Sequence, residues 1–183
     1  MSYKGPLATD TTYGLVQVGT GITVTDGVIS GSTGLLNYGF FSNGTQTNPV
    51  ASAVNLATFS ITGPANGISI VGGTALTVVN AGVYTATYTL NVNKTSGGTS
   101  PISIWLRQNG VDIPGSSQTL DLINTLSTIF VTGNFTTSMA AGENIQLAWS
   151  SPDTTVALLA IPAAVGPIRP TGASVKITLT RIS

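Results

Sequence analysis

Residues 83–92 read VYTATYTLNV, and this stretch decides the fold class. Apolar and polar side chains alternate along it without a break. The apolar half consists of Tyr84, Ala86, Tyr88, Leu90 and Val92. Successive side chains of a strand point to opposite faces, whereas a helix brings every third or fourth residue to one face. The stretch therefore predicts a β-strand with one apolar face and one threonine-rich face.

The same two-residue period recurs on both sides of this stretch. It is clear in residues 102–107, 144–149 and 173–182. Helix signals are almost absent, and Gly, Asn and Pro interrupt the chain at short intervals. About ten strands in some 150 residues are typical of an antiparallel two-sheet jelly-roll sandwich, an all-β fold. An immunoglobulin-like sandwich is the alternative, although that fold usually needs only about 100 residues.

Turn signals set the expected strand boundaries. Asn109-Gly110 predicts a tight hairpin, and Gly72-Gly73 is expected to separate two paired strands. Residues 64–67 (PANG) and Gly133-Asn134 are also interpreted as turns. Residues 35–183 as a whole are assigned to one domain.

Residues 1–34 differ from the rest and are assigned to a short β-rich arm. Its apolar residues form two patches, which are Leu15, Val16 and Val18, and then Ile22 and Val24. Asp26-Gly27 is a hairpin signal, but so short a ribbon cannot bury its own apolar face. The arm therefore needs a partner, either copies of itself around an axis or a docking surface on another protein.

Charge is scarce in this chain. Six basic and six acidic residues make up 7% of it, against about 25% in an ordinary domain. A lone monomer needs surface charge to stay soluble and apart from its neighbours. The chain either covers much of its surface in an assembly or relies on Thr, Ser and Asn for hydration, and we favour the first reading. A basic footprint is missing, so no nucleic-acid partner is expected.

The chain contains no cysteine and no histidine. Disulfides, zinc-thiolate sites and thiol nucleophiles are thereby excluded, and so are the usual general base and the commonest transition-metal ligand. We therefore expect no enzyme activity, no cofactor and no metal. Neither a secretory signal nor an apolar run long enough for a transmembrane helix is visible. We expect synthesis in a cytoplasm and no membrane partner.

The acidic residues of the main domain are scattered along it, at Asp112, Asp121, Glu143 and Asp153. A calcium site would need several such oxygens brought together. A glycosidase would need a carboxylate pair, for which Asp121 and Glu143 are the candidates. No motif supports either site, so turn capping and solvation are the favoured roles.

Several motifs follow one another in a distinctive order in residues 37–183. They are AGVY (residues 81–84), IWLRQNG (residues 104–110) and AGENIQL (residues 141–147), followed by a final alternating strand. This order resembles the C1q/TNF-like jelly-roll family, although Glu143 stands where the family usually has Asp. Leu158-Leu159 also stand where that family often has an aromatic-rich segment. The resemblance implies a homotrimer, because such domains pack three to a bundle.

Other segments resemble domains in the virion proteins of tailed phages. They are ANGISIV (residues 65–71), IWLRQNG again, and LAWSSPDT (residues 147–154). Residues 13–22 and 26–30 resemble the short shaft repeats of phage fibres. The resemblance implies a structural protein of the virion that is assembled in the host cytoplasm.

Seven aromatic residues are candidates for the trimer interface or the core. They are Tyr38, Phe40, Phe41, Tyr84, Tyr88, Trp105 and Trp149. Tyr and Trp can also stack on a sugar, but their large area and partly polar character favour packing.

The functional expectation is a homotrimeric capsid decoration or head-fibre protein. The arm would attach it to the major capsid protein or another virion protein. A tail-fibre tip that binds a receptor is the alternative, but some 30 residues reach at most about 100 Å, which is short for a fibre shaft. A second alternative is a carbohydrate-binding module for host surface glycans. Its site would lie in loops 93–101, 113–119 and 161–170.

Overall fold

The computed structural model describes residues 22–25, 28–31, 36–123 and 128–183. Internal contacts divide the chain into two units, Met1–Leu35 and Leu36–Ser183. In the first unit, β1 (Ile22–Thr25) pairs antiparallel with β2 (Val28–Gly31). Over the described residues, no helix is long and apolar enough to cross a membrane.

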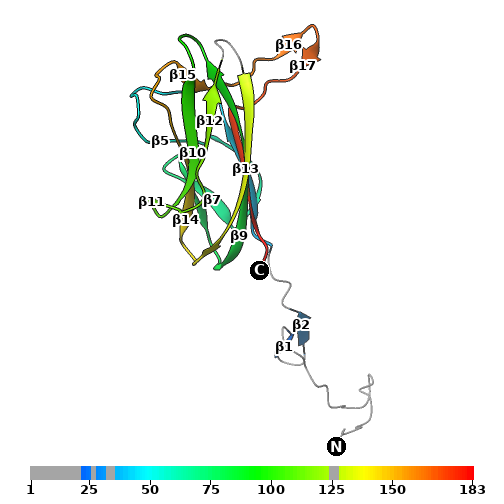
Figure 1. Cartoon of the computed structure of the whole chain (residues 1–183). Helices are drawn as coiled ribbons and strands as arrows, with labels where there is room; N and C mark the ends of the chain where they lie inside the picture. Colours follow the sequence, from blue (N-terminus) through cyan, green and yellow to red (C-terminus); the bar gives the residue numbers. More distant parts are fainter. Residues whose placement is uncertain (1–21, 26–27, 32–35, 124–127) are drawn as a thin grey trace, which may run out of the picture. The chain divides into compact units, whose positions relative to one another are not determined.

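The second unit is a sandwich of two antiparallel sheets (Figure 1). The first, called the β9 sheet, consists of β3 (Tyr38–Asn43), β4 (Gln46–Thr47), β6 (Ile61–Asn66), β9 (Gly82–Lys94), β13 (Thr128–Met139), β15 (Val156–Leu158) and β18 (Val175–Arg181). The second, called the β14 sheet, consists of β5 (Asn55–Leu56), β7 (Ile68–Val71), β8 (Ala75–Val78), β10 (Ser100–Gln108), β11 (Val111–Asp112), β12 (Gln118–Leu122) and β14 (Asn144–Ser150). A separate ribbon consists of β16 (Ala164–Val165) and β17 (Ile168–Arg169).

The strand pairs of the sandwich are nested along the chain. The outermost pair is β3 with β18, and the pairs β8–β14, β9–β13 and β10–β12 lie successively inside it. All four pairs are antiparallel, and they are divided between the two sheets. Nested antiparallel pairing across two sheets is the jelly-roll topology. The predicted all-β jelly-roll sandwich is therefore confirmed.

The core lies between the two sheets. The five alternating apolar residues of β9 are all buried, as the sequence predicts. Opposite them, the β14 sheet buries Ile102, Ile104, Leu106, Ile145, Leu147 and Trp149. The two-residue period of β9 therefore separates a core face from an outward face as far as Leu90, beyond which Asn91 and Asn93 are buried as well.

The two ends of strand β9 mark the two ends of the domain. At the Gly82 end the backbone N–H of Arg181 donates to the carbonyl oxygen of Asn37, 2.8 Å away, so the chain enters and leaves the domain there. At the Lys94 end β9 stops, β10 begins, and β15 pairs with the last residues of β9.

Two of the predicted turns are confirmed, one is right only at its last residue, and one is wrong. Gly72 and Gly73 connect β7 to β8, and Asn109-Gly110 connects β10 to β11 with positive φ at both residues. Residues 64–66, in contrast, belong to β6. Because β6 is an edge strand, the missing backbone N–H of Pro64 costs no hydrogen bond between strands. Only Gly67, with a φ of 67°, makes a turn there.

Gly133 is the second correction, because it lies in the middle of β13 and not in a turn. It stands directly opposite Tyr88 of β9. A Cβ at this position would come within 2.2 Å of the phenol ring of Tyr88. Glycine is present because the buried tyrosine occupies the space of the missing side chain.

We predict that Gly133→Ala destabilises the domain. The added methyl group must displace a buried ring, and such overpacking typically costs about 1–3 kcal/mol in the free energy of unfolding. Urea unfolding of Gly133→Ala and of Gly98→Ala measures the effect, since Gly98 has open space around its Cβ position. In a Tyr88→Ala background the cost of Gly133→Ala should largely disappear. Equal costs in both backgrounds would contradict the assignment.

Candidate functional site

The predicted aromatic residues separate into three places. Phe41, Tyr84, Tyr88 and Trp149 are buried in the core between the sheets. Burial raises the pKa of the Tyr84 and Tyr88 phenols, and for Tyr84 the nearby Arg181 opposes this shift. Tyr38 and Phe40 point out of the β9 sheet, and Trp105 points out of the opposite sheet. The arm residues Leu15, Val16 and Val18 lie outside the described residues, and Ile22 and Val24 belong to β1.

Tyr38 and Phe40 belong to a continuous outward face of the β9 sheet, called the threonine face below. It consists of Tyr38, Phe40, Thr85, Thr87, Thr89, Phe130, Thr132, Asn134, Thr136, Lys176, Thr178 and Thr180. Cross-strand rows organise it, because Phe40, Thr178, Thr87 and Asn134 are successive partners in neighbouring strands. Lys176 is the one charged side chain in this set.

Hydrogen bonds within the threonine face join neighbouring strands. The Thr85 and Thr136 hydroxyl oxygens are 3.0 Å apart, and Asn134 Nδ2 donates to Thr87 Oγ1 at 3.2 Å. Phe130, on the edge strand β13, is 64% exposed. The face therefore combines short, internally bonded polar groups with apolar rings at its margins, a surface that packs against another with little desolvation cost.

Trp105 belongs to a separate hollow on the β14 sheet. Its neighbours Ile104 and Leu106 point into the core, so the alternation turns Trp105 outward. Trp105 Nε1 donates to Asp112 Oδ1 at 2.7 Å, and Arg107 Nε is 2.8 Å from the same oxygen. The hollow has a volume of about 350 Å³ and is lined by Trp105, Asp112, Ile113, Pro114, Gly115 and Ser117. Trp105 is therefore not part of the surface that carries Tyr38 and Phe40.

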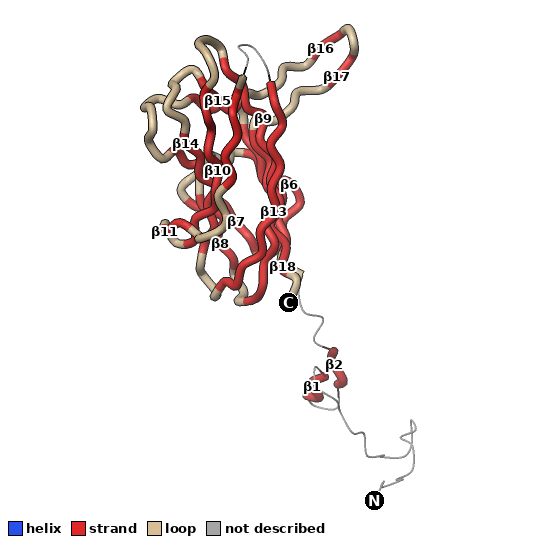
Figure 2. The backbone as a smooth tube through the Cα atoms, in the orientation of Figure 1, coloured by secondary structure: helices blue, strands red, loops and turns tan. Residues whose placement is uncertain are grey.

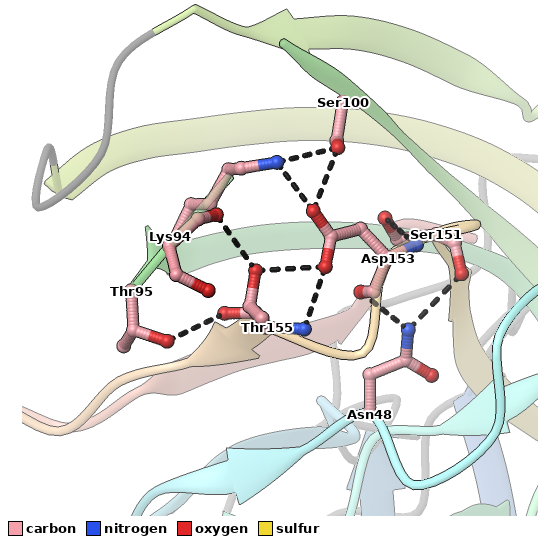
Figure 3. Close-up of polar contacts among 8 residues, drawn as sticks. Asn48, Lys94, Thr95, Ser100, Ser151, Asp153 and Thr155 are labelled. Carbon is pink, nitrogen blue, oxygen red and sulfur yellow. Dashed lines mark hydrogen bonds and ion pairs between the residues drawn. The ribbon is translucent and has the colours of Figure 1, made fainter. Parts of the chain in front are cut away.

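A buried polar cluster closes the Lys94 end of the sandwich (Figure 3). Lys94 has a fully buried side chain, and its Nζ donates to Ser100 Oγ at 2.5 Å and to Asp153 Oδ2. The other carboxylate oxygen of Asp153 accepts bonds from the backbone N–H and the hydroxyl of Thr155. Every polar group of the ion pair thus has a partner, which is the condition under which a buried charge is tolerated.

The cluster joins four segments that are far apart in the sequence. Asn48, in the segment after β4, donates from Nδ2 to the carbonyl oxygens of Ser151 and Asp153, each 3.0 Å away. Lys94 ends β9, and Ser100 begins β10. The cluster fixes these loops but offers no free reactive group, so its role is structural. This pair has no signal in the sequence, since no local pattern links residues 59 positions apart.

Each of the remaining acidic side chains has a different environment. Glu143 accepts bonds from Ala140 N, Gln108 Nε2 and Asn109 Nδ2, each at 2.8 Å, and so caps the turn before β14. The backbone bond from Ala140, followed by the bond from Gln108, lowers the pKa of Glu143. Among the described residues, no group of three or more Asp, Glu, His or Cys side chains is placed to hold a metal ion.

Asp121 and Glu143 do not form a glycosidase pair. Asp121 is opposite Pro101 at the start of β10, whereas Glu143 bonds to Gln108 at its end. At about 3.3 Å per residue these positions are about 20 Å apart. Glycosidase carboxylates are about 5–10 Å apart.

Comparisons with known proteins add a fold neighbour and no family. A scan against protein-family models found no match, and a search of curated proteins found none. Among solved structures, the chain is similar to the crystal structure of murine APRIL, with 10% sequence identity and a TM-score of 0.45. The alignment covers 80% of this chain and 99% of that chain. The likeness bears on the fold alone, and the jelly-roll assignment rests on the nested strand pairs described above.

We predict that Asp153→Asn is strongly destabilising at neutral pH. The substitution leaves the buried Lys94 ammonium without an anion, and removing one partner of a buried pair costs about 3–5 kcal/mol. We expect the lower end of that range because the Asp153 side chain is 22% exposed. Asp112→Asn is the matched control, since it breaks the ion pair with Arg107 in which the Asp112 side chain is 63% exposed, and it should cost at most about 1 kcal/mol. Equal losses in urea unfolding would contradict a special role for the buried pair.

Acid is expected to weaken the domain through the same carboxylate. The hydrogen bond from Lys94, followed by those from Thr155, holds the pKa of Asp153 well below its ordinary value of 3.8. The unfolded chain therefore takes up a proton before the folded chain does. The contribution of ionised Asp153 to the free energy of unfolding is therefore fully present well above pH 3.8, and it declines as the pH falls below that value. Urea midpoints measured between pH 7 and pH 2 should fall less steeply for Asp153→Asn, and an unchanged slope would contradict this account.

Proposed function

We propose that this chain is a non-enzymatic structural subunit of a phage virion, a homotrimer that decorates the capsid. Its jelly-roll domain projects from the particle, and residues 1–34 attach it to the major capsid protein or another virion protein. The resemblance of several segments to virion proteins of tailed phages supports the phage assignment.

The observation that carries the trimer is the threonine face. One whole side of the β9 sheet bears a single charged side chain, Lys176, and exposes the rings of Tyr38 and Phe130. Surface charge keeps soluble monomers from associating, and this face has almost none. The face therefore does not suit a free monomer in water. Packed against copies of itself, the face buries apolar rings and desolvates few charges. Closed rotational symmetry would cover it in every copy.

Glycan binding is the second candidate, and the Trp105 hollow is the observation that favours it. A partly exposed indole ring beside a carboxylate and a guanidinium provides a stacking surface together with hydrogen-bonding groups. The hollow includes part of loop 113–119, one of the three loops expected from the sequence to form a sugar site. The two candidates are compatible, because the hollow and the threonine face belong to opposite sheets.

Binding to purified capsids and to a glycan array separates the two candidates. Decoration predicts binding to purified capsids that lack this protein. Glycan recognition predicts array signals that Trp105→Ala removes. Cryo-electron microscopy of whole particles then locates the subunit, and density on the tail alone would contradict capsid decoration.

We predict that Thr178→Arg dissociates the trimer without unfolding the domain. Thr178 is exposed in the middle of the threonine face, where an unpaired guanidinium would be buried on assembly. Burying an uncompensated charge costs several kcal/mol, so the dissociation constant should rise at least about a hundredfold. Sedimentation at micromolar concentration measures this.

Ser69→Arg is the control for this prediction, because Ser69 is equally exposed but belongs to β7 of the other sheet. It should stay trimeric, with a melting temperature close to that of the wild type. A wild-type chain that sediments as a stable monomer would contradict the proposed trimer.

A further inference from the structure

A hollow of about 570 Å³ opens between the two sheets and is lined by residues of β4 in one sheet and of β5 in the other. Figure 2 shows these two layers of strands, with β9 in one and β14 in the other. Trp149 of β14 and Asn55 of β5 are direct partners, so their side chains lie on the same, inner face of their sheet. Both residues line the hollow, and the Trp149 ring, which is 1% exposed, lies at its floor. We call this site the Trp149 hollow.

Two hydrogen-bonded bridges hold the walls of the Trp149 hollow in place. Gln46 of β4 reaches the segment after β5, where its Oε1 accepts from Thr58 N at 2.7 Å and its Nε2 donates to Thr58 O at 3.3 Å. Asn55 Nδ2 donates to Asn48 Oδ1 at 2.9 Å. Asn48 is itself fixed within the buried polar cluster of Figure 3. Walls that are already held in this way are preorganised, so a ligand has to order few side chains on binding.

The indole N–H of Trp149 lacks a hydrogen-bond partner. Trp149 Nε1 bonds to no atom of the described residues, and the burial of the ring keeps bulk water away from it. Trp105 Nε1, in contrast, donates to Asp112. A buried indole N–H usually has a partner, and leaving one without a partner destabilises the protein. An oxygen atom that enters from the hollow would supply the missing acceptor.

The rest of the lining selects an uncharged ligand. Five of the nine described lining residues carry amide or hydroxyl groups, and none of the nine carries a charge. A charged ligand would therefore lose its hydration without gaining a counter-charge. Asn55 Oδ1 accepts no bond from the described residues, so it remains available as an acceptor. Pro49 and Val54 add exposed apolar surface at the rim.

We propose that the Trp149 hollow binds an uncharged N-acetylated sugar through its acetamido group. The acetamido carbonyl oxygen accepts from Trp149 Nε1, the acetamido N–H donates to Asn55 Oδ1, and the sugar ring rests on Pro49 and Val54. Side chains above the indole turn aside on binding, a change that is common at binding surfaces. The inference depends neither on the proposed trimer nor on the Trp105 hollow, because the Trp149 hollow is a separate site.

The chain has two tryptophans, so the two indole N–H groups provide the test. In a nitrogen–proton correlation spectrum of the intact, isotope-labelled protein each gives one signal, and Trp105→Phe assigns them. N-acetylglucosamine should move the Trp149 signal with half-saturation at about 1–10 mM, as expected for so small an uncharged ligand. The Trp105 signal should stay in place. Glucose, which lacks the acetamido group, and protonated glucosamine, which is charged, should bind at least about tenfold more weakly.

Two variants at exposed valines form a matched pair. Val54→Phe fills the rim of the hollow and should weaken N-acetylglucosamine binding at least about tenfold, because the larger ring occupies the place of the sugar. Val111→Phe adds the same ring at β11, which β10 separates from β14, and should leave binding unchanged. Both variants should keep a melting temperature close to that of the wild type, since both positions are exposed.

Each outcome decides for or against the site. A shift of the Trp149 signal that Val54→Phe weakens and Val111→Phe does not supports the proposal. An equal response to glucose overturns the assignment of the acetamido group. A Trp149 signal that none of the three sugars moves overturns the site, and the indole then pairs with nothing larger than an ordered water. A response of the Trp105 signal alone overturns it as well and places sugar binding in the Trp105 hollow.

Discussion

The two-residue alternation of β9 is the constraint on which the rest of the molecule depends. This strand of 13 residues pairs along its whole length with β13 on one side and with β18 and then β15 on the other. Its inward side chains carry the core, and its outward threonines carry the face proposed for assembly. A shift of one residue in its register would exchange the two sets, placing threonines in the core and tyrosines in water. The core and the proposed interface are therefore specified by one periodicity.

The sequence predicted those features of the fold that depend on local pattern. The alternating strands, the Asn109-Gly110 hairpin and the jelly-roll class follow from periodicity and turn chemistry within a few residues. Gly133 and residues 64–66 were misinterpreted because the reason for their presence is tertiary. Gly133 leaves room for a ring on a neighbouring strand, and Pro64 is allowed by an edge position. Composition alone shows neither a cross-strand partner nor an edge.

The candidate surfaces were predictable to a smaller extent. The seven aromatic residues gave a sound list but no division among core, threonine face and hollow. To make that division, one must know which face of its strand each residue occupies. Trp105 is an example, since it points outward although both of its neighbours are buried. The Lys94–Asp153 pair and the unpaired indole N–H of Trp149 had no sequence signal. Scarce charge did predict an extended uncharged surface, because twelve charged residues cannot cover both sheets of the domain.

The Lys94 cluster also determines where the domain tolerates added sequence. Lys94 and Ser100, which flank the loop between β9 and β10, are both held to Asp153, so the loop is anchored at each side of its base. Gly98 within it has open space around it. This loop is about 40 Å along β9 from the Gly82 end, where the arm joins the domain. A passenger peptide inserted at Gly98 would thus be displayed at the end of the domain opposite the one where residue 36 enters it, whereas one fused to Ser183 would emerge at the same end as residue 36.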